Sequence, residues 1–222
     1  MNCFIMLISA GLIFACFSYL ACGYRHYCNS EEKDKKLLLR PPLDKSAWLA
    51  VGLWAVSSAL FAKSLLLGHE NFLQSLINGE TALWLGLAAL IDAKKRIIPN
   101  HLIVFEAGWW LVTAVLQVVV LHSGIRNMLV FSGLGFVLCG GAFLVIALLL
   151  RSALGMGDVK MVAVLGLLYG VFDTYSTILL AMILMAVIAL VLLAAKKVTR
   201  KSRMPMAPFM FAAFVINVIL GM

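Results

Sequence analysis

Residues 91–100 read IDAKKRIIPN and separate two apolar runs, which we place at 72–92 and 101–122. Each run is as long as the ~20 apolar residues that an α-helix needs to cross the hydrocarbon core of a bilayer. Pro99 suits the first turn of a helix, where its missing N–H is harmless. The stretch therefore predicts two membrane-spanning helices joined by a short basic turn.

Apolar runs of this kind continue along the whole chain. The other six lie at 4–24, 47–67, 128–150, 159–171, 174–195 and 205–221. The run at 159–171 is too short to cross a bilayer squarely, and Gly170 with Asp173 marks its break from the next run. We expect an all-α fold, a polytopic membrane helix bundle with about seven or eight transmembrane segments.

The composition agrees with a membrane protein. The 222 residues are 64% hydrophobic and 13% charged, whereas a water-soluble domain of this size needs a polar outer face. We expect a single membrane domain over residues 1–222. Within it, residues 1–71 would hold N-terminal helices and a polar cytoplasmic loop at 25–45, and residues 72–221 would form the functional core.

The basic residues predict the orientation in the membrane. Of the 18 lysines and arginines, 16 lie in the loops at 25–45, 93–100, 151–160 and 196–203. With eight segments these four loops fall on one side, which the positive-inside rule assigns to the cytoplasm. The net charge of +8 follows from this topology, so we expect the lipid bilayer, and no nucleic acid, as a partner.

Two aspartates stand at the ends of apolar runs. Asp92 closes the run at 72–92, and Asp158 lies in the segment GMGDVK at 155–160 and opens the run at 159–171. Carboxylates near a bilayer are costly and mark functional sites, and these two are expected at one membrane depth. A close pair would share one proton, so that one takes a proton from water and the other donates to a scissile carbonyl oxygen. That chemistry is peptide hydrolysis with no metal and no cofactor.

The residues beside the aspartates have expected local roles. We expect Gly155 to end the fifth helix with a positive φ, and Gly157 to allow a sharp turn that leaves room for a substrate strand. Asn100 is expected to satisfy exposed backbone groups. Because helix N-termini favour negative charge and C-termini disfavour it, Asp158 is the expected ionised partner and Asp92 the protonated one.

Each acidic residue also has a simpler interpretation. Asp92 alone could be an interfacial acid paired with the basic residues that follow it, and a lone Gly-x-Gly-Asp could be a turn with a capping aspartate. Glu80 and Glu106, inside apolar runs, fit structural or interhelical hydrogen-bonding roles. The four histidines and five cysteines are not spaced to build a metal site.

The two aspartate motifs, in this order, resemble those of the type IV prepilin peptidase family, membrane aspartyl proteases with a Gly-x-Gly-Asp motif. Residues 205–209, PMAPF, look like the family's Pro-Phe-Gly-Pro-Phe segment at the start of the last helix, with Met206 and Ala207 replacing Phe and Gly. Lys160 matches a typical family position. The resemblance covers about residues 72–221 and implies that Asp92 and Asp158 are the catalytic pair.

The resemblance also implies an activity and a substrate class. A member of this family would remove the basic leader from prepilin or pseudopilin substrates at the cytoplasmic face of a bacterial inner membrane. Many bacterial members carry two Cys-x-x-Cys pairs in an N-terminal cytoplasmic insertion associated with N-methylation, and loop 25–45 has no such pair. The resemblance therefore implies a short form that acts as a peptidase alone.

Three other functions remain open on the sequence. A presenilin-like intramembrane protease would use the same chemistry, although its first aspartate usually follows a tyrosine and Ile91 precedes Asp92 here. A proton-coupled transporter could relay protons through Asp92 and Asp158, although we find no internal repeat of the kind that many transporters have. A non-catalytic scaffold of a pilus machine is the third.

Overall fold

The computed structural model describes residues 52, 55–61, 72–121, 125–149, 155–196 and 204–221. Helices make up 92% of this part of the chain, which contains no strands, so the all-α prediction is confirmed. The predicted run at 4–24 and the loop at 25–45 lie outside the described residues, as does most of the run at 47–67.

The described helices coincide with the predicted apolar runs. They are α3 (Phe72–Lys95), α4 (Asn100–Leu121), α5 (Ile125–Gly135), the π-helix η1 (Phe136–Gly140), α6 (Gly141–Leu149), α7 (Met156–Ala194) and α8 (Ala207–Leu220). Four stretches are long and apolar enough to cross a membrane, at Leu73–Lys95, Asn100–Val118, Ile125–Leu149 and Met156–Ala194, and α8 is a shorter apolar helix. The membrane-protein prediction is confirmed, and the count of seven or eight segments stays a prediction.

The chain divides into two compact units, Met1–Leu87 and Ala88–Met222, with the boundary inside α3. In the first unit, the Ser57 hydroxyl donates a hydrogen bond to the Gly79 carbonyl of α3, at 2.5 Å. A Cβ on Gly79 would lie 3.4 Å from the carbonyl oxygen of Ser57, so the absence of a side chain there allows this close approach. Both predicted aspartates belong to the second unit.

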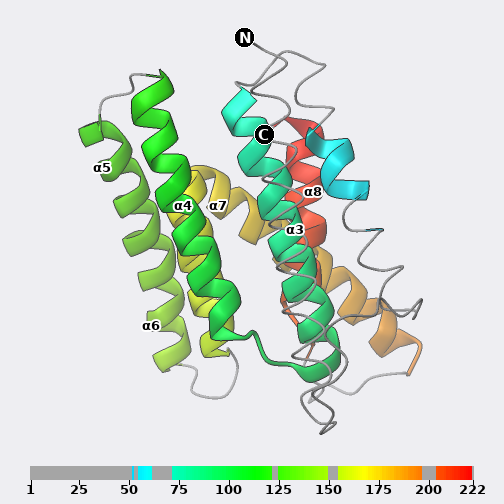
Figure 1. The fold of residues 1–222 in the computed structure, drawn as a ribbon. Coiled ribbons are helices and arrows are strands. Elements are labelled where there is room, and N and C mark those ends of the chain that lie inside the picture. Colours follow the sequence, from blue (N-terminus) through cyan, green and yellow to red (C-terminus); the bar gives the residue numbers. More distant parts are fainter. Residues whose placement is uncertain are drawn as a thin grey trace, which may run out of the picture. The chain divides into compact units, whose positions relative to one another are not determined.

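The second unit is built around α7, which packs against α4, α5, η1, α6 and α8. The predicted break at Gly170 is present as a kink, with φ 71° and ψ −163° at that residue. Gly170 therefore divides Met156–Ala194 into two helical arms, which correspond to the runs predicted at 159–171 and 174–195. In Figure 1 the yellow middle of α7 lies above both of its ends, so the second arm returns to the side from which the first arm starts.

Several helix ends of the second unit therefore share one side. In Figure 1, α4 begins, α6 ends, and α7 both begins and ends toward the lower side of the view. This is the arrangement that the predicted placement of the basic loops at 93–100, 151–160 and 196–203 requires. Asp158, in the first turn of α7, lies at this side of the unit.

Glycines allow the helices of this unit to approach backbone to backbone. A Cβ on Gly166 of α7 would overlap the carbonyl of Gly135 at the end of α5, and a Cβ on Gly140 would lie 2.6 Å from the Cβ of Ala163. Such small-residue contacts are typical of helices that associate within membranes, where close packing replaces the hydrophobic effect. They hold the first arm of α7 against α5 and η1.

Polar and aromatic contacts join α7 to α8. The Asn217 amide is buried and donates hydrogen bonds to the hydroxyl oxygens of Ser176, at 3.3 Å, and Thr177, at 3.0 Å. The rings of Tyr169 and Phe214 meet edge to face, with centroids 5.4 Å apart. These contacts fix α8 against both arms of α7, and so they place the start of α8 relative to the site described below.

Candidate active site

Asp92 lies in the last turn of α3 and is buried, with 6% of its surface exposed. The helix ends three residues later, where Arg96 adopts a left-handed conformation, φ 54°, while its N–H still bonds to the Asp92 carbonyl at 2.9 Å. The charge of Arg96 is close enough to act on the Asp92 carboxylate. The basic residues that follow Asp92 thus end the helix without exposing its carboxylate.

The linker between α3 and α4 consists of residues 96–99, and one of its side chains is buried in the protein. Ile97 is exposed, whereas Ile98 is buried. Pro99 stands immediately before α4, and its carbonyl accepts a hydrogen bond from the Leu102 N–H at 3.2 Å, so it precedes the first turn of the helix, in which it was predicted to lie. The linker is short enough that burial of Ile98 fixes its path.

Asp158 is half-buried in the first turn of α7. Its own N–H donates to the Gly155 carbonyl at 3.0 Å, and its carboxylate accepts a hydrogen bond from the Gly155 backbone N–H. This reciprocal pattern is that of a capping box, in which the third helical residue satisfies the amide of the N-cap. A local backbone contact therefore orients the Asp158 carboxylate.

The prediction for Gly155 is wrong. Gly155 is the N-cap of α7, in an extended conformation with φ −78° and ψ 142°, and it does not end the fifth helix with a positive φ. The reason is that α6 ends at Leu149 and α7 begins directly after Gly155. A Cβ at Gly155 would lie 3.2 Å from Oδ2 of Asp158, so the glycine gives the carboxylate room.

The prediction for Gly157 is wrong as well. Gly157 is a helical residue of α7 and makes no turn. The space beside it holds Ile98 of the linker, because a Cβ on Gly157 would lie 3.0 Å from the Cβ of Ile98. Gly157 therefore lets the linker that follows Asp92 pack against the turn that carries Asp158.

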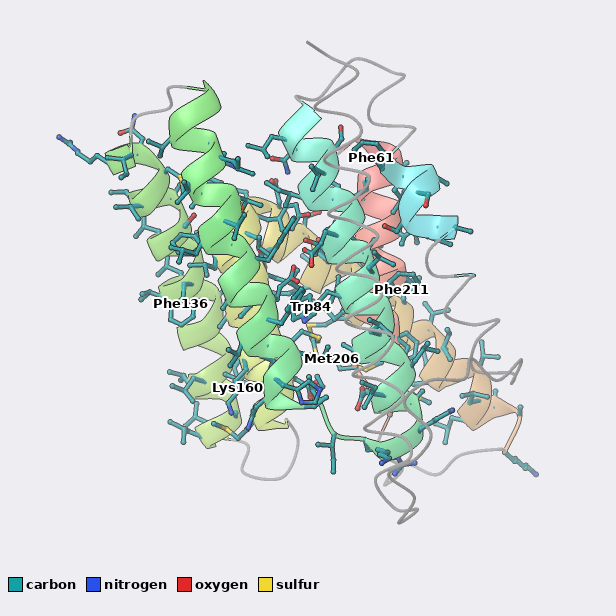
Figure 2. All side chains as sticks on the ribbon, viewed as in Figure 1. Phe61, Trp84, Phe136, Lys160, Met206 and Phe211 are labelled. Atoms are coloured by element: carbon teal, nitrogen blue, oxygen red, sulfur yellow. The ribbon has the colours of Figure 1, made fainter. Side chains whose placement is uncertain are left out.

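Asn100 and Lys160 form a second connection between these segments. Asn100 begins α4, and its side-chain oxygen accepts a hydrogen bond from Lys160 Nζ at 2.9 Å. The contact is exposed and joins the starts of α4 and α7, and Figure 2 shows Lys160 at that end of the bundle. The expected role of Asn100 toward the backbone is thus replaced by a side-chain contact, which also gives Lys160 a place in the site.

The start of α8 is a participant that sequence reasoning missed. The Ala207 N–H donates a hydrogen bond to Oδ2 of Asp92 at 3.2 Å, and the Met206 backbone bonds to the same carboxylate. Asp92 thus faces a helix N-terminus as well as its own helix C-terminus, and the former favours negative charge. The dipole argument that made Asp92 the protonated partner considered α3 alone, and it does not hold for this geometry.

Four segments therefore meet at the predicted dyad: the end of α3, the linker, and the starts of α7 and α8. The two carboxylates of Asp92 and Asp158 are close enough to act on each other electrostatically. Asp92 accepts a hydrogen bond from the Ala207 N–H at the start of α8. Asp158 accepts one from the N–H of Gly155, the N-cap of its own helix. Two neighbouring carboxylates in partly dry surroundings can share a proton and act as acid and base together.

Two further acidic residues, Glu80 and Glu106, lie inside the described helices. Glu80 belongs to the first unit, and Glu106 lies in α4 of the second; both are fully buried. Their structural interpretation stays a prediction. Among the described residues, no group of three or more His, Cys, Asp and Glu side chains is arranged to hold a metal ion.

Comparison with known proteins gives one match. The model of the type IV leader peptidase family matches residues 81–190, a stretch that contains Asp92, Asp158 and Lys160. No curated protein and no solved structure matches the chain.

Proposed function

Since residues 81–190 belong to the type IV leader peptidase family, we propose that this protein is a membrane aspartic endopeptidase that removes the basic leader from prepilin or pseudopilin substrates. The observation that carries the proposal is that Ile98, in the linker after Asp92, packs against Gly157, the neighbour of Asp158, and so brings these aspartates of two different helices together. The family match favours this function over the proton-coupled transporter and the presenilin-like protease.

The pair would act through one shared proton. The ionised carboxylate takes a proton from a water molecule, whose oxygen bonds to the carbonyl carbon of the scissile peptide. The protonated carboxyl group gives its proton to the carbonyl oxygen. Collapse of the tetrahedral intermediate breaks the C–N bond, and the amine leaves with a proton from the dyad. No covalent bond to the enzyme forms.

The site has the position that such a substrate needs. Asp92 lies in the last turn of one apolar helix and Asp158 in the first turn of another, so the dyad would lie at a membrane face and not at mid-depth. By the positive-inside rule this face is cytoplasmic, because basic loops flank it. The apolar segment of a prepilin would lie among the helices, and its basic leader would stay in the cytoplasm of a cell whose inner membrane holds the enzyme.

Substitution of each aspartate tests the proposal. Asp92→Asn and Asp158→Asn should each abolish leader removal from a co-expressed prepilin, seen as a missing gel shift, because neither half of a shared-proton pair works alone. Asp173→Asn is a matched control, since Asp173 is an exposed acid in the second arm of α7. Processing by either dyad variant at the control's rate would exclude the proposed mechanism.

A further inference from the structure

The first N–H groups of α8 have an unusual set of acceptors. Helix N-termini leave their first amides without partners inside the helix, and a capping side chain usually supplies the acceptor. The N-cap of α8 is Met206, whose side chain makes no such bond. The local sequence therefore cannot cap this helix in the usual way.

Each of the early donors can nevertheless be accounted for. Pro208 has no N–H, and the N–H groups of Phe209 and Met210 both bond to the Met206 carbonyl at 3.1 Å. The Ala207 N–H remains, and it donates to Asp92, which precedes it by 115 residues and also bonds to the Met206 backbone. Asp92 therefore does for α8 what a Ser or Asp at the N-cap does for other helices.

We infer that the first turn of α8 is a positioning element of the active site: the Ala207 amide, beside the backbone of Met206, holds the Asp92 carboxylate in the orientation in which it shares a proton with Asp158. Ala207 is fully buried, so water has no access to compete for this amide. Met206 and Ala207, which replace Phe and Gly of the resembling segment, keep the backbone amide that makes the contact. This inference rests on the proposed peptidase function.

The burial of the contact makes its geometry stiff. Asp92 is 6% exposed and Ala207 0%, and the buried Asn217 anchors the far end of α8 to Ser176 and Thr177 of α7. The helix that orients Asp92 is thereby fixed to the helix whose first turn carries Asp158. Loss of the Ala207 amide would remove the hydrogen bond to Oδ2 and loosen the orientation of the carboxylate, although the contact with the Met206 backbone would remain.

Replacing Ala207 by lactic acid tests the inference, because the ester removes this one N–H and keeps the side chain. The rate constant kcat for leader cleavage should fall by a factor on the order of 10 to 100 with KM unchanged, as expected when a reacting group is misplaced by a fraction of an ångström. A phenyllactic acid ester at Phe211 is the matched control, since it removes an N–H inside the same helix (Figure 2). Equal kcat values for the two esters would overturn the inference.

A second measurement needs no peptidase activity. Hydrogen exchange of the ¹⁵N-labelled Ala207 amide, in detergent micelles, should be slow in the wild type and in Asp92→Asn, whose side-chain oxygen still accepts the bond. In Asp92→Ala, exchange should be faster by a factor on the order of 5, the ratio that a lost helix cap implies. Identical exchange in all three proteins would overturn the inference, even if the enzyme cleaves prepilin. Slow exchange in a wild-type protein that does not cleave prepilin would refute the proposed function and leave the inference standing.

Discussion

Gly157→Ala is expected to disable the site by steric means alone. The added Cβ would lie 3.0 Å from the Cβ of Ile98, whereas aliphatic carbons prefer about 3.5–4.0 Å. The linker after Asp92 would therefore have to move by a few tenths of an ångström, which approaches the ~0.5 Å that a catalytic constellation tolerates. Because a misplacement of about 1 Å can cost a hundredfold in rate, this smaller displacement is expected to lower kcat by up to about tenfold.

The structure also specifies which second substitution should compensate. Ile98→Gly removes both the Cβ and the Cγ1 that the new methyl group would meet, and the next atom, the Ile98 N, lies at 3.5 Å, an ordinary contact. Ile98→Ala keeps the offending Cβ. In the Ile98→Gly background, Gly157→Ala should cost no further activity, and in the Ile98→Ala background it should cost nearly as much as in the wild type.

The assay is the initial rate of leader removal from a purified prepilin in micelles, with protein amounts matched. Gly108→Ala in α4 is the control, because a Cβ there meets nothing within 4 Å. Wild-type activity in Gly157→Ala would refute the reasoning, as would an equal loss in both Ile98 backgrounds. Wild-type activity would mean that the linker moves aside at no cost. An equal loss in both backgrounds would mean that Gly157 acts through a residue other than Ile98.

Four further predictions follow from the fold and the site. Lys160→Met and Asn100→Ala should each lower the free energy of unfolding by at most about 1 kcal/mol, and the double variant no more than either alone, as measured by denaturation in micelles. Gly166→Ala, whose methyl group would overlap the backbone of α5, should destabilise the protein by about 1–3 kcal/mol or more, seen as a lower Tm. In a cysteine-free version, a cysteine at Lys95 should resist an impermeant thiol reagent in intact cells and one at Ser123 should react, because the basic loops are expected inside; the opposite pattern would reject the cytoplasmic site. The protein should cleave prepilin without S-adenosylmethionine and add no methyl group, and a methyl gain in the intact mass of mature pilin that depends on this protein and on S-adenosylmethionine would refute the peptidase-only form.

The sequence predicted the helices of the described part of the chain well. The run at 72–92 became α3 and the run at 101–122 became α4, each within three residues at either end, because the length of an apolar run is set by the thickness of the bilayer. The break at Gly170 was also predictable, since a glycine followed closely by an acid interrupts an otherwise continuous apolar pattern.

The local roles of the glycines could not be predicted in the same way. Whether Gly155 ends one helix or begins the next depends on where the intervening connection lies, and both assignments fit the sequence. The place of Gly157 depends on Ile98, which the fold brings to it from a different segment. The motif indicated that small residues are needed there without indicating which neighbour requires them.

The tertiary contacts of the dyad were beyond sequence reasoning. The dipole argument treated each aspartate by its own helix, whereas Asp92 also receives the amide of α8. The hydrogen bond between Asn100 and Lys160 likewise joins residues of two separate motifs, and neither motif predicted this contact. The one signal in the sequence for the contact between α8 and Asp92 was the segment at 205–209. Its resemblance to a family motif indicated that the start of α8 matters, but it did not indicate what that segment contacts.

The central claim is that Asp92 and Asp158 form one proteolytic unit, and purified protein in liposomes tests it most directly. Incubation with a purified prepilin, followed by intact-mass analysis, should show cleavage at a single bond that separates the basic leader from the apolar segment. Asp92→Asn, Asp158→Asn and the double variant should all leave the substrate at its full mass, with no difference among them, because the two carboxylates act as a unit. Leader cleavage that persists in any of these variants, or no cleavage by the wild type, would contradict the account.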